Sequence, residues 1–261
     1  MRSDVSDPFT VISAQSGDIR PTELMVFGER NSGTNLAHEL LRRNIPAFAN
    51  SPGDRIGKYG YRYGWKHGFP QMLAAPDTAL AIGIFRHPET WVQSMHARPW
   101  HAVPALRDLP FDQFIRAQWQ SRVDEKNFGI QNGDARAMAE LHWDRHPLTG
   151  QRFENILALR VAKSTGFLSL PVRFANCLLV QFEAVQNNPE GFVAYVARAF
   201  GLPTKAAFQT VEERRGKPSD GPFTPQIRPA LSPEDRSFVW YQIDTAQEAA
   251  LGYAPLTCAP E

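Results

Sequence analysis

Three apolar runs along the chain lack the alternation of polar and apolar residues that a half-exposed strand would show. They cover residues 24–27, 79–85 and 178–182. A strand buried on both faces has this continuous apolar pattern, which is typical of parallel sheets. A further short strand is predicted at 61–66. The pattern therefore predicts a buried, parallel sheet.

Apolar residues with helical spacing follow these runs. The first helix carries Leu36, Leu40 and Leu41 and ends near Asn44. Ser232 has the residue type and spacing of an N-cap for the last helix. Other helices are predicted around 91–95, over 189–200 and from 233 to about 252. Strands that alternate with helices predict an α/β protein of three layers, α/β/α, with a central, mostly parallel sheet.

The distribution of polar residues suggests one domain with a loose beginning. Residues 1–20 are polar and are predicted to form a flexible tail, and residues 21–261 to form a single domain. Within it, residues 97–175 mix prolines, glycines and charges. We expect this region to be a helical insertion on the substrate side.

Composition narrows the class of protein. The 28 Lys and Arg residues nearly balance the 27 Asp and Glu residues, so the net charge of +1 argues against a nucleic-acid-binding protein. No apolar run approaches the roughly 20 residues of a membrane span, and the N-terminus lacks the apolar core of a signal peptide. The two cysteines form no CxxC motif and no disulfide framework. We therefore expect a cytoplasmic protein.

A polar loop bounded by glycines follows the first apolar run. Its pattern, Gly28-x4-Gly33-Thr34-Asn35, has the glycine spacing of a phosphate-binding loop. In such a loop, backbone N–H groups and a helix N-terminus converge on an anion. Thr34 and Asn35 stand where nucleotide triphosphatases have the phosphate-binding lysine and the Mg²⁺-binding hydroxyl. The pattern thus predicts an anion cradle without ordinary ATP chemistry; the alternative is a plain glycine turn.

The second apolar run ends in Arg86, where a Mg²⁺-dependent P-loop enzyme usually has an acid. A guanidinium matches the oxygens of a phosphate, and Ser94 lies about two helical turns further on. Arg86 and Ser94 could therefore hold the same phosphate. The alternative is that Arg86 caps a carbonyl group and Ser94 lies on the surface. Glu183, after the third run, is the comparable acid for a metal-dependent reaction.

These loops resemble those of the sulfotransferases that use 3′-phosphoadenosine 5′-phosphosulfate (PAPS). Residues 30–36, RNSGTNL, resemble the family's [KR]-S-G-T-[ST] loop, and residues 86–94, RHPETWVQS, resemble its R-[DN]-P-x-[DE]-x-x-x-S motif. Residues 180–202 resemble the family's "yEdl…P…fLGl" segment, and residues 214–217, RRGK, its late "RKG" motif. The resemblance covers most of residues 22–253.

The resemblance implies a P-loop-type fold and a PAPS site. The first loop would cradle the 5′-phosphosulfate, and Arg86, Ser94 and the late basic motif would hold the 3′-phosphate. Whether Arg30 or Lys66 meets the transferred sulfo group stays open, as does the residue of 214–217 that meets the 3′-phosphate. The implied cofactor-binding residues are Arg30, Asn31, Ser32, Gly33, Thr34, Asn35, Arg86, Ser94, Arg215, Gly216 and Lys217.

Lys66 and His67 are the candidate catalytic residues. They stand in Trp65-Lys66-His67-Gly68, about as far before Arg86 as the family's K-x-H motif. An imidazole with an ordinary pKa of about 6.5 can accept the proton of an acceptor hydroxyl, and the lysine would neutralise charge on the sulfo group. Adjacent residues of a strand point to opposite faces, so both reach one site only if the strand has ended. The alternative for His67 is a turn histidine.

Further charged and histidine residues allow two interpretations each. Arg160 and Lys163, three apart, are either a solvated helix face or contacts for an anion. His142 and His146 have the spacing of a metal pair, but their neighbours resemble a surface turn. Trp143 could stack on an acceptor or pack in the core. No metal site is predicted.

The sequence thus favours a sulfotransferase that transfers a sulfo group from PAPS to a hydroxyl of a carbohydrate or small molecule and releases 3′-phosphoadenosine 5′-phosphate. The first alternative is a P-loop kinase of small molecules that uses ATP and Mg²⁺, with Glu183 as the acid. The second is a non-catalytic nucleotide-binding module. The acceptor and the oligomeric state are left open.

Overall fold

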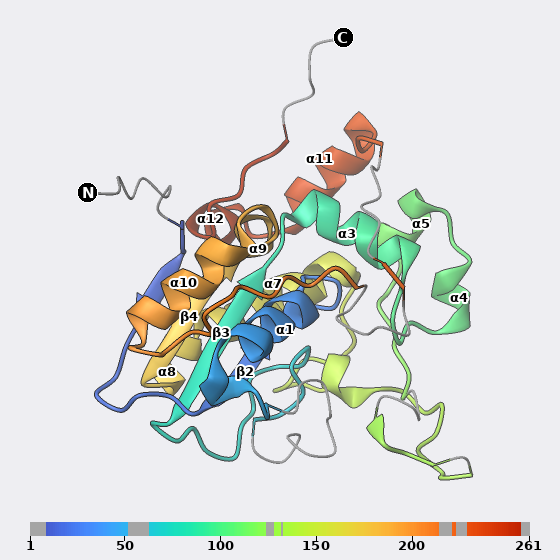
Figure 1. Cartoon of the computed structure of the whole chain (residues 1–261). Helices are drawn as coiled ribbons and strands as arrows, with labels where there is room; N and C mark the ends of the chain where they lie inside the picture. Colours follow the sequence, from blue (N-terminus) through green and yellow to red (C-terminus); the bar gives the residue numbers. More distant parts are fainter. Residues whose placement is uncertain are drawn as a thin grey trace.

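A four-stranded sheet forms the centre of the molecule. The computed structural model describes residues 9–51, 63–123, 128–131, 133–213, 221–222 and 229–256. Its strands are β1 (Ser13–Gln15), β2 (Glu23–Phe27), β3 (Ala79–Phe85) and β4 (Asn176–Gln181), in the order β1-β4-β3-β2 (Figure 1). Strands β2, β3 and β4 run parallel, and β1 pairs antiparallel with β4. The prediction of an α/β protein with a central, mostly parallel sheet is confirmed.

Helices cover both faces of this sheet (Figure 1). One face packs against α1 (Thr34–Asn44), α9 (Phe182–Asn187) and α10 (Pro189–Ala199). The other packs against α7 (Ile156–Leu168) and α8 (Leu170–Arg173). The other described helices are η1 (Pro46–Phe48), α3 (Pro88–Ala97), α4 (Pro104–Arg107), α5 (Phe111–Arg116), η2 (His142–Asp144), α11 (Pro233–Gln242) and α12 (Thr245–Ala250).

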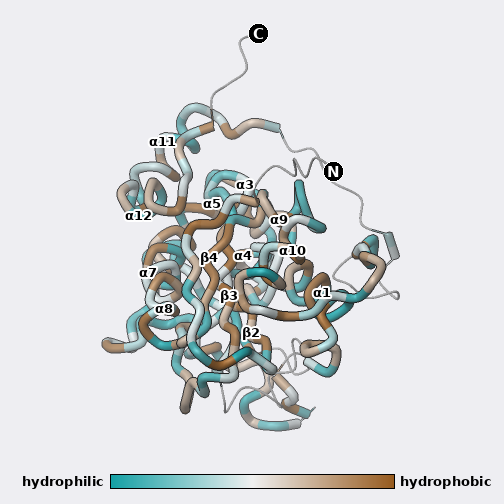
Figure 2. Tube along the Cα trace, turned by 60° about the vertical axis from the view of Figure 1, so that its left-hand side comes forward, coloured by the Kyte–Doolittle hydropathy of each residue, from teal (hydrophilic) through white to brown (hydrophobic). Residues whose placement is uncertain are grey.

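The strands have no polar alternation because both faces are buried. Leu24 and Val26 of β2 pack with the α1 side, whereas Met25 and Phe27 pack with the α7 side. All seven residues of β3 are buried. Figure 2 shows the strands as a brown, apolar centre between the helices. Burial on both faces is the physical reason for the continuous apolar runs in the sequence.

The region 97–175 contributes to two parts of the fold. Its first helices, α4 and α5, join α3 and α11 in a second apolar cluster that includes Trp91, Phe114 and Val239. Its later helix α7 lies against β3 and covers one face of the sheet. The region therefore supplies a layer of the central fold as well as a lobe beside α3.

Three predictions differ from the observed elements. Residues 13–15 of the predicted tail form β1 and pair with β4. The described part of the expected strand 61–66 contains no strand, because Gly64 has a positive φ of 78° and the chain turns at Trp65, whose carbonyl accepts the N–H of Gly68. The expected last helix is divided into α11 and α12, because Ile243 is extended and Asp244 caps a new helix.

The cap predicted for the last helix is confirmed. The Ser232 side chain accepts the Asp235 N–H at 3.1 Å.

Within the described ranges, no helix has both the length and the apolar character needed to cross a bilayer.

Gly33→Ala should destabilise the protein more than Gly133→Ala. Both glycines have left-handed backbones, with φ of 92° and 88°, and alanine there costs about 1–2 kcal/mol. A Cβ at Gly33 would also overlap the Phe182 ring, whereas no described atom lies within 4 Å of a Cβ at Gly133. The overlap should add about 1–3 kcal/mol. Urea unfolding measures both losses, and equal losses would contradict close packing at Gly33.

Candidate functional site

The glycine loop lies between the end of β2 and the start of α1. Asn31 and Gly33 are both in the left-handed region, with φ of 62° and 92°, and they turn the chain tightly into the helix. Gly33 is the N-cap residue, and within the described chain no side chain caps the helix. The first N–H groups of α1 therefore have neither intrahelical nor side-chain acceptors, which is the arrangement that favours an anion.

Two side chains of this loop stabilise the loop itself. The Asn31 amide donates to the Ser94 and Arg98 carbonyls, at 3.2 and 3.1 Å, and so ties the loop to the end of α3. The Ser32 hydroxyl donates to the Glu29 carbonyl at 2.6 Å. Asn31 and Ser32 thus hold the conformation in which the N–H groups of the next residues are presented.

Arg86 reaches the glycine loop from the end of β3. Its Nη1 donates to the Asn31 carbonyl at 3.0 Å, and its Nε donates to the Thr90 hydroxyl at 3.2 Å. The guanidinium lies over the Phe182 ring, 4.9 Å from its centroid. Ser94 is buried on the same face of α3, one turn after Thr90. The fold therefore brings Arg86, Ser94 and the loop together, and it also gives Arg86 the carbonyl contact that the alternative interpretation expected.

Lys66 and His67 both contact the loop. The Lys66 Nζ donates to the Asn35 side-chain oxygen at 2.6 Å, at the first turn of α1. The His67 Nδ1 lies 2.7 Å from the Gly28 carbonyl oxygen. Adjacent residues reach the same loop because the chain has already left the extended conformation at Gly64.

The contact with Gly28 determines which tautomer His67 adopts. A carbonyl oxygen only accepts hydrogen bonds, so Nδ1 carries the hydrogen and Nε2 keeps its lone pair. Burial, followed by the neighbouring Lys66 charge, holds the His67 pKa well below its ordinary value. Within the described residues Nε2 has no hydrogen-bond partner. His67 is therefore a neutral imidazole with an available acceptor nitrogen.

Arg30 points into the interior, where it meets Asp144. The Arg30 Nη1 lies 2.8 Å from the Asp144 carboxylate, and the Lys163 Nζ contacts the other oxygen of the same carboxylate. Ser121 donates its hydroxyl to this carboxylate at 2.6 Å. Burial opposes ionisation of Asp144, but the charges of Arg30 and Lys163 outweigh it and lower the pKa. The three residues form a buried cluster beneath the loop.

The structure overturns two expectations about this region. The solvated-face interpretation of Arg160 and Lys163 is wrong, since their exposed fractions are 1% and 0%. Arg160 pairs with Glu248 at 2.7 Å and donates to the Arg86 carbonyl at 2.8 Å. The surface-turn interpretation of residues 142–147 is wrong for Asp144, which is 4% exposed.

Sequence reasoning missed Asp144 and Glu29 as members of the site. The segment that contains Asp144, Asp-Arg-His-Pro-Leu-Thr-Gly, has a distinctive composition, but its partners lie far away in the chain. Glu29 lies beside the first glycine, and it has the residue type of a solvated loop. Its burial could not be inferred from that type.

Glu29 is a buried acid without a hydrogen-bond partner in the described chain. Its side chain is 4% exposed, and neither carboxylate oxygen has a donor. The charges around it are those of Lys163 and Arg160 from α7, Arg30 from its own loop and Asp144 from η2. Burial is the largest effect on Glu29, and it raises the pKa above the ordinary value.

Glu183, the acid considered for a metal-dependent reaction, supports the fold. One of its carboxylate oxygens accepts the His87 N–H at 2.9 Å, and the other accepts the Tyr253 hydroxyl at 2.9 Å. Among the described residues, no three His, Cys, Asp or Glu side chains are grouped so that they could hold a metal ion. His142 and His146 are thus not part of such a group.

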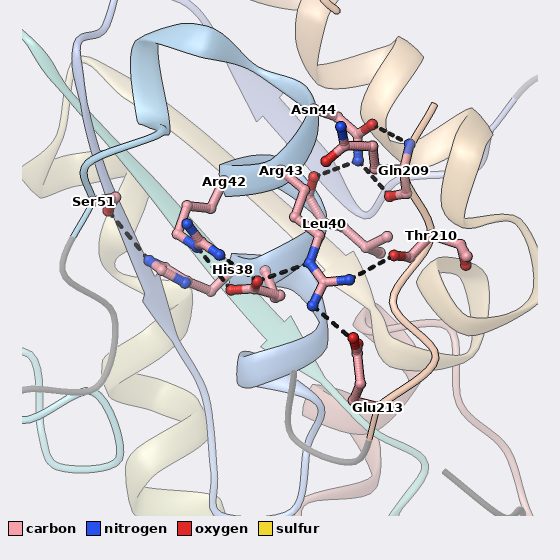
Figure 3. A network of polar contacts seen from close by, with 10 residues as sticks. His38, Leu40, Arg42, Arg43, Asn44, Ser51, Gln209, Thr210 and Glu213 are labelled. Carbon is pink, nitrogen blue, oxygen red and sulfur yellow. Dashed lines mark hydrogen bonds and ion pairs between the residues drawn. The ribbon is translucent and has the colours of Figure 1, made fainter. Parts of the chain in front are cut away.

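The late basic residues Arg215, Gly216 and Lys217 lie outside the described residues, but the segment before them is anchored to α1 (Figure 3). Arg43 donates to the Thr210 carbonyl at 2.8 Å and to Glu213 at 2.9 Å. Hydrogen bonds also join Asn44 to the backbone of Gln209. The segment 209–213 is thus attached to the helix that begins at the glycine loop.

No family model matches the chain, and neither a curated protein nor a solved structure matches it.

The wild-type protein should lose stability as the pH rises, because the buried Glu29 side chain then loses its proton. The variant Glu29→Gln should not show this loss. The Glu29 pKa is raised in the folded protein, so above the ordinary value of 4.5 the folded state binds more protons than the unfolded state. Stability should then fall as the pH rises towards the folded pKa and level off above it. Urea unfolding from pH 4 to pH 9 measures the difference between wild type and variant.

The exposed Glu212 provides the control for this experiment. Glu212→Gln should follow the wild-type dependence on pH. Parallel curves for wild type and Glu29→Gln would contradict a buried proton at Glu29.

Proposed function

We propose that the protein is a sulfotransferase of P-loop type that transfers a sulfo group from PAPS to a hydroxyl group. The observation that carries this proposal is the convergence of Lys66, His67 and Arg86 on one glycine loop at the ends of β2 and β3. Ligands of open α/β sheets bind outside the carboxyl ends of the strands. A base and two cations at this edge fit the transfer of an anionic group.

The donor would span the loop and the start of α3. The N–H groups of Gly33, Thr34 and Asn35 would hold the 5′-phosphosulfate at the N-terminus of α1. Arg86 and Ser94 would hold the 3′-phosphate, and the late basic motif, Arg215, Gly216 and Lys217, would contribute to the same phosphate. Asn31 and Ser32 would keep the loop in shape, and Arg30 would add positive charge from below rather than by contact.

PAPS supplies an activated sulfo group, and the protein's residues handle the proton and the charge. His67 accepts the proton of the acceptor hydroxyl on Nε2, and the hydroxyl oxygen forms a bond to sulfur. The bond from sulfur to the 5′-phosphate oxygen breaks, and 3′-phosphoadenosine 5′-phosphate leaves with both electrons of that bond. Lys66 and the N–H groups of α1 stabilise the charge on the sulfo and phosphate oxygens. The Gly28 carbonyl stabilises the positive imidazolium through Nδ1.

The kinase alternative is less favoured by the same geometry. A kinase would need an acid free to hold Mg²⁺, whereas both Glu183 oxygens accept hydrogen bonds from His87 and Tyr253. The loop also has Thr34 and Asn35 in place of the lysine and hydroxyl that serve ATP and Mg²⁺.

3′-Phosphoadenosine 5′-phosphate should stabilise the protein more than ATP with Mg²⁺ does. At one hundred times its Kd, the bisphosphate should add about 2.7 kcal/mol to the free energy of unfolding. Arg86→Lys should weaken it much more than it weakens adenosine 5′-phosphosulfate, which lacks the 3′-phosphate, and Arg136→Lys on an exposed loop is the control. Thermal unfolding and calorimetry measure both effects. Stabilisation by ATP with Mg²⁺ alone would favour a kinase.

His67→Asn should lower turnover by about 10²–10⁴-fold and leave bisphosphate affinity unchanged. The asparagine amide keeps a donor for the Gly28 carbonyl, but it removes the accepting Nε2. His96→Asn is the matched control, because the His96 ring also contacts a carbonyl, that of Leu109 at 2.9 Å. Sulfo transfer to a hydroxyl acceptor is the readout. Normal turnover in His67→Asn would move the base to another residue.

A further inference from the structure

A cavity of about 400 Å³ opens beside the candidate site, between residues 64–71 and residues 142–150. Its walls include the rings of Trp65, Phe69 and Trp143, together with His142 and His146. It adjoins the proposed base, because Trp65 lines the cavity and its ring packs edge-on against His67, with centroids 5.6 Å apart. The Trp65 indole therefore joins the wall of the cavity to the residue that we assign to proton transfer.

Trp143 provides an aromatic platform. Its indole stacks on Trp65, with the centroids 6.0 Å apart and the rings inclined by 28°. The residue nevertheless keeps 42% of its surface exposed. The face of an indole is electron-rich and attracts the polarised C–H bonds of a sugar ring as well as other rings.

Polar groups surround this platform. The His146 Nδ1 lies 3.3 Å from the backbone nitrogens of Leu148 and Thr149, whose N–H groups can only donate. Nδ1 therefore accepts, and the hydrogen of the neutral ring is on Nε2, which can donate to a ligand. Hydroxyl groups around the edge of a ring would meet this donor while the ring packs on Trp143.

The charged groups at the polar wall bind one another, with Arg145 and Arg152 sharing the Glu140 carboxylate. Arg145 lines the cavity, but its Nε and Nη2 donate to Glu140 at 3.0 and 2.6 Å, and its Nη1 donates to the Gly150 carbonyl at 2.9 Å. Hydrogen bonds from Arg152 and then Arg145 lower the Glu140 pKa to about 2, so this acid is ionised at neutral pH. Each nitrogen of the Arg145 guanidinium therefore already has an acceptor within the protein, and none is needed to hold an anionic ligand.

The loop that forms this wall is held in place before any ligand arrives. The Gly150 N–H donates to the His146 carbonyl at 2.8 Å, and the His146 N–H donates to the Gln151 carbonyl at 2.9 Å. Asp144, next to Trp143, is fixed by the buried pairs with Arg30 and Lys163. A preformed cavity of this kind is typical of small-molecule sites.

We propose that this cavity binds a neutral, polyhydroxylated ring, and that the acceptor of the sulfo group is therefore a carbohydrate. The exposed indole would take the C–H face of the sugar, and His146 would donate to a hydroxyl. The assignment as acceptor rests on the proposed sulfotransferase function, whereas the binding of a neutral saccharide does not depend on it.

A panel of neutral mono- and oligosaccharides tests this proposal by binding. The wild-type protein should bind members of the panel, and Trp143→Ala should weaken that binding at least tenfold. Trp143→Phe, which keeps a smaller ring, should give intermediate affinity, and it keeps the test decisive if the alanine variant does not fold. Tyr241→Ala removes an aromatic ring that is 84% exposed on α11, and it should change nothing. Calorimetry on the best binders gives the affinities.

Three results would overturn the proposal. They are no binding of any neutral saccharide by the wild type, equal binding by wild type and both Trp143 variants, or stronger binding of planar phenols such as 2-naphthol. Binding of 3′-phosphoadenosine 5′-phosphate, measured in parallel, separates the two proposals. Saccharide binding that depends on Trp143 without any bisphosphate binding would support the cavity and contradict the sulfotransferase.

Discussion

The pairing of one buried carboxylate, Asp144, with two buried cations is the interaction on which the rest of the site depends. It joins Arg30 of the glycine loop to Lys163 of α7. Removing one member of such a cluster typically costs about 3–5 kcal/mol, because the other charges stay buried without compensation. The cluster also fixes the position of Trp143, because Asp144 points inward while the neighbouring Trp143 lines the cavity. The two ion pairs of Asp144 thus position both the glycine loop and the proposed acceptor wall.

The glycine loop keeps its shape through contacts that leave its N–H groups available. Asn31 and Ser32 bond to backbone carbonyls, and Arg86 bonds to the Asn31 carbonyl. Gly33 packs so closely on Phe182 that a side chain would not fit. Because the side chains of the loop serve its conformation, an anion would be bound chiefly by backbone dipoles, with cations added from neighbouring strands. This division explains how the loop could function without the lysine of nucleotide triphosphatases.

Much of the fold and part of the site could be predicted from the sequence. The apolar runs at 24–27 and 79–85 identify buried strands, because a strand covered on both faces leaves no polar position. Glycine spacing identified the turn after β2, since only glycine tolerates both the positive φ and the close approach at Gly33. The resemblance assigned Arg86 and this turn to one cofactor, and the two lie together because parallel strands bring their carboxyl ends to the same edge. The apolar runs and the glycine spacing are local signals, since each can be recognised from residues that are close together in the sequence.

The sequence by itself determined the three buried parallel strands, the glycine turn and the helix that follows it. Tertiary structure alone decided which charges are buried. Arg160 and Lys163 have the spacing of an exposed helix face, yet they lie inside because Glu248 and Asp144 are brought to them from distant segments. The same holds for Glu29, whose loop position suggests solvent. The energy of a charge depends on its surroundings in space, and residue type and spacing along the chain do not contain that information.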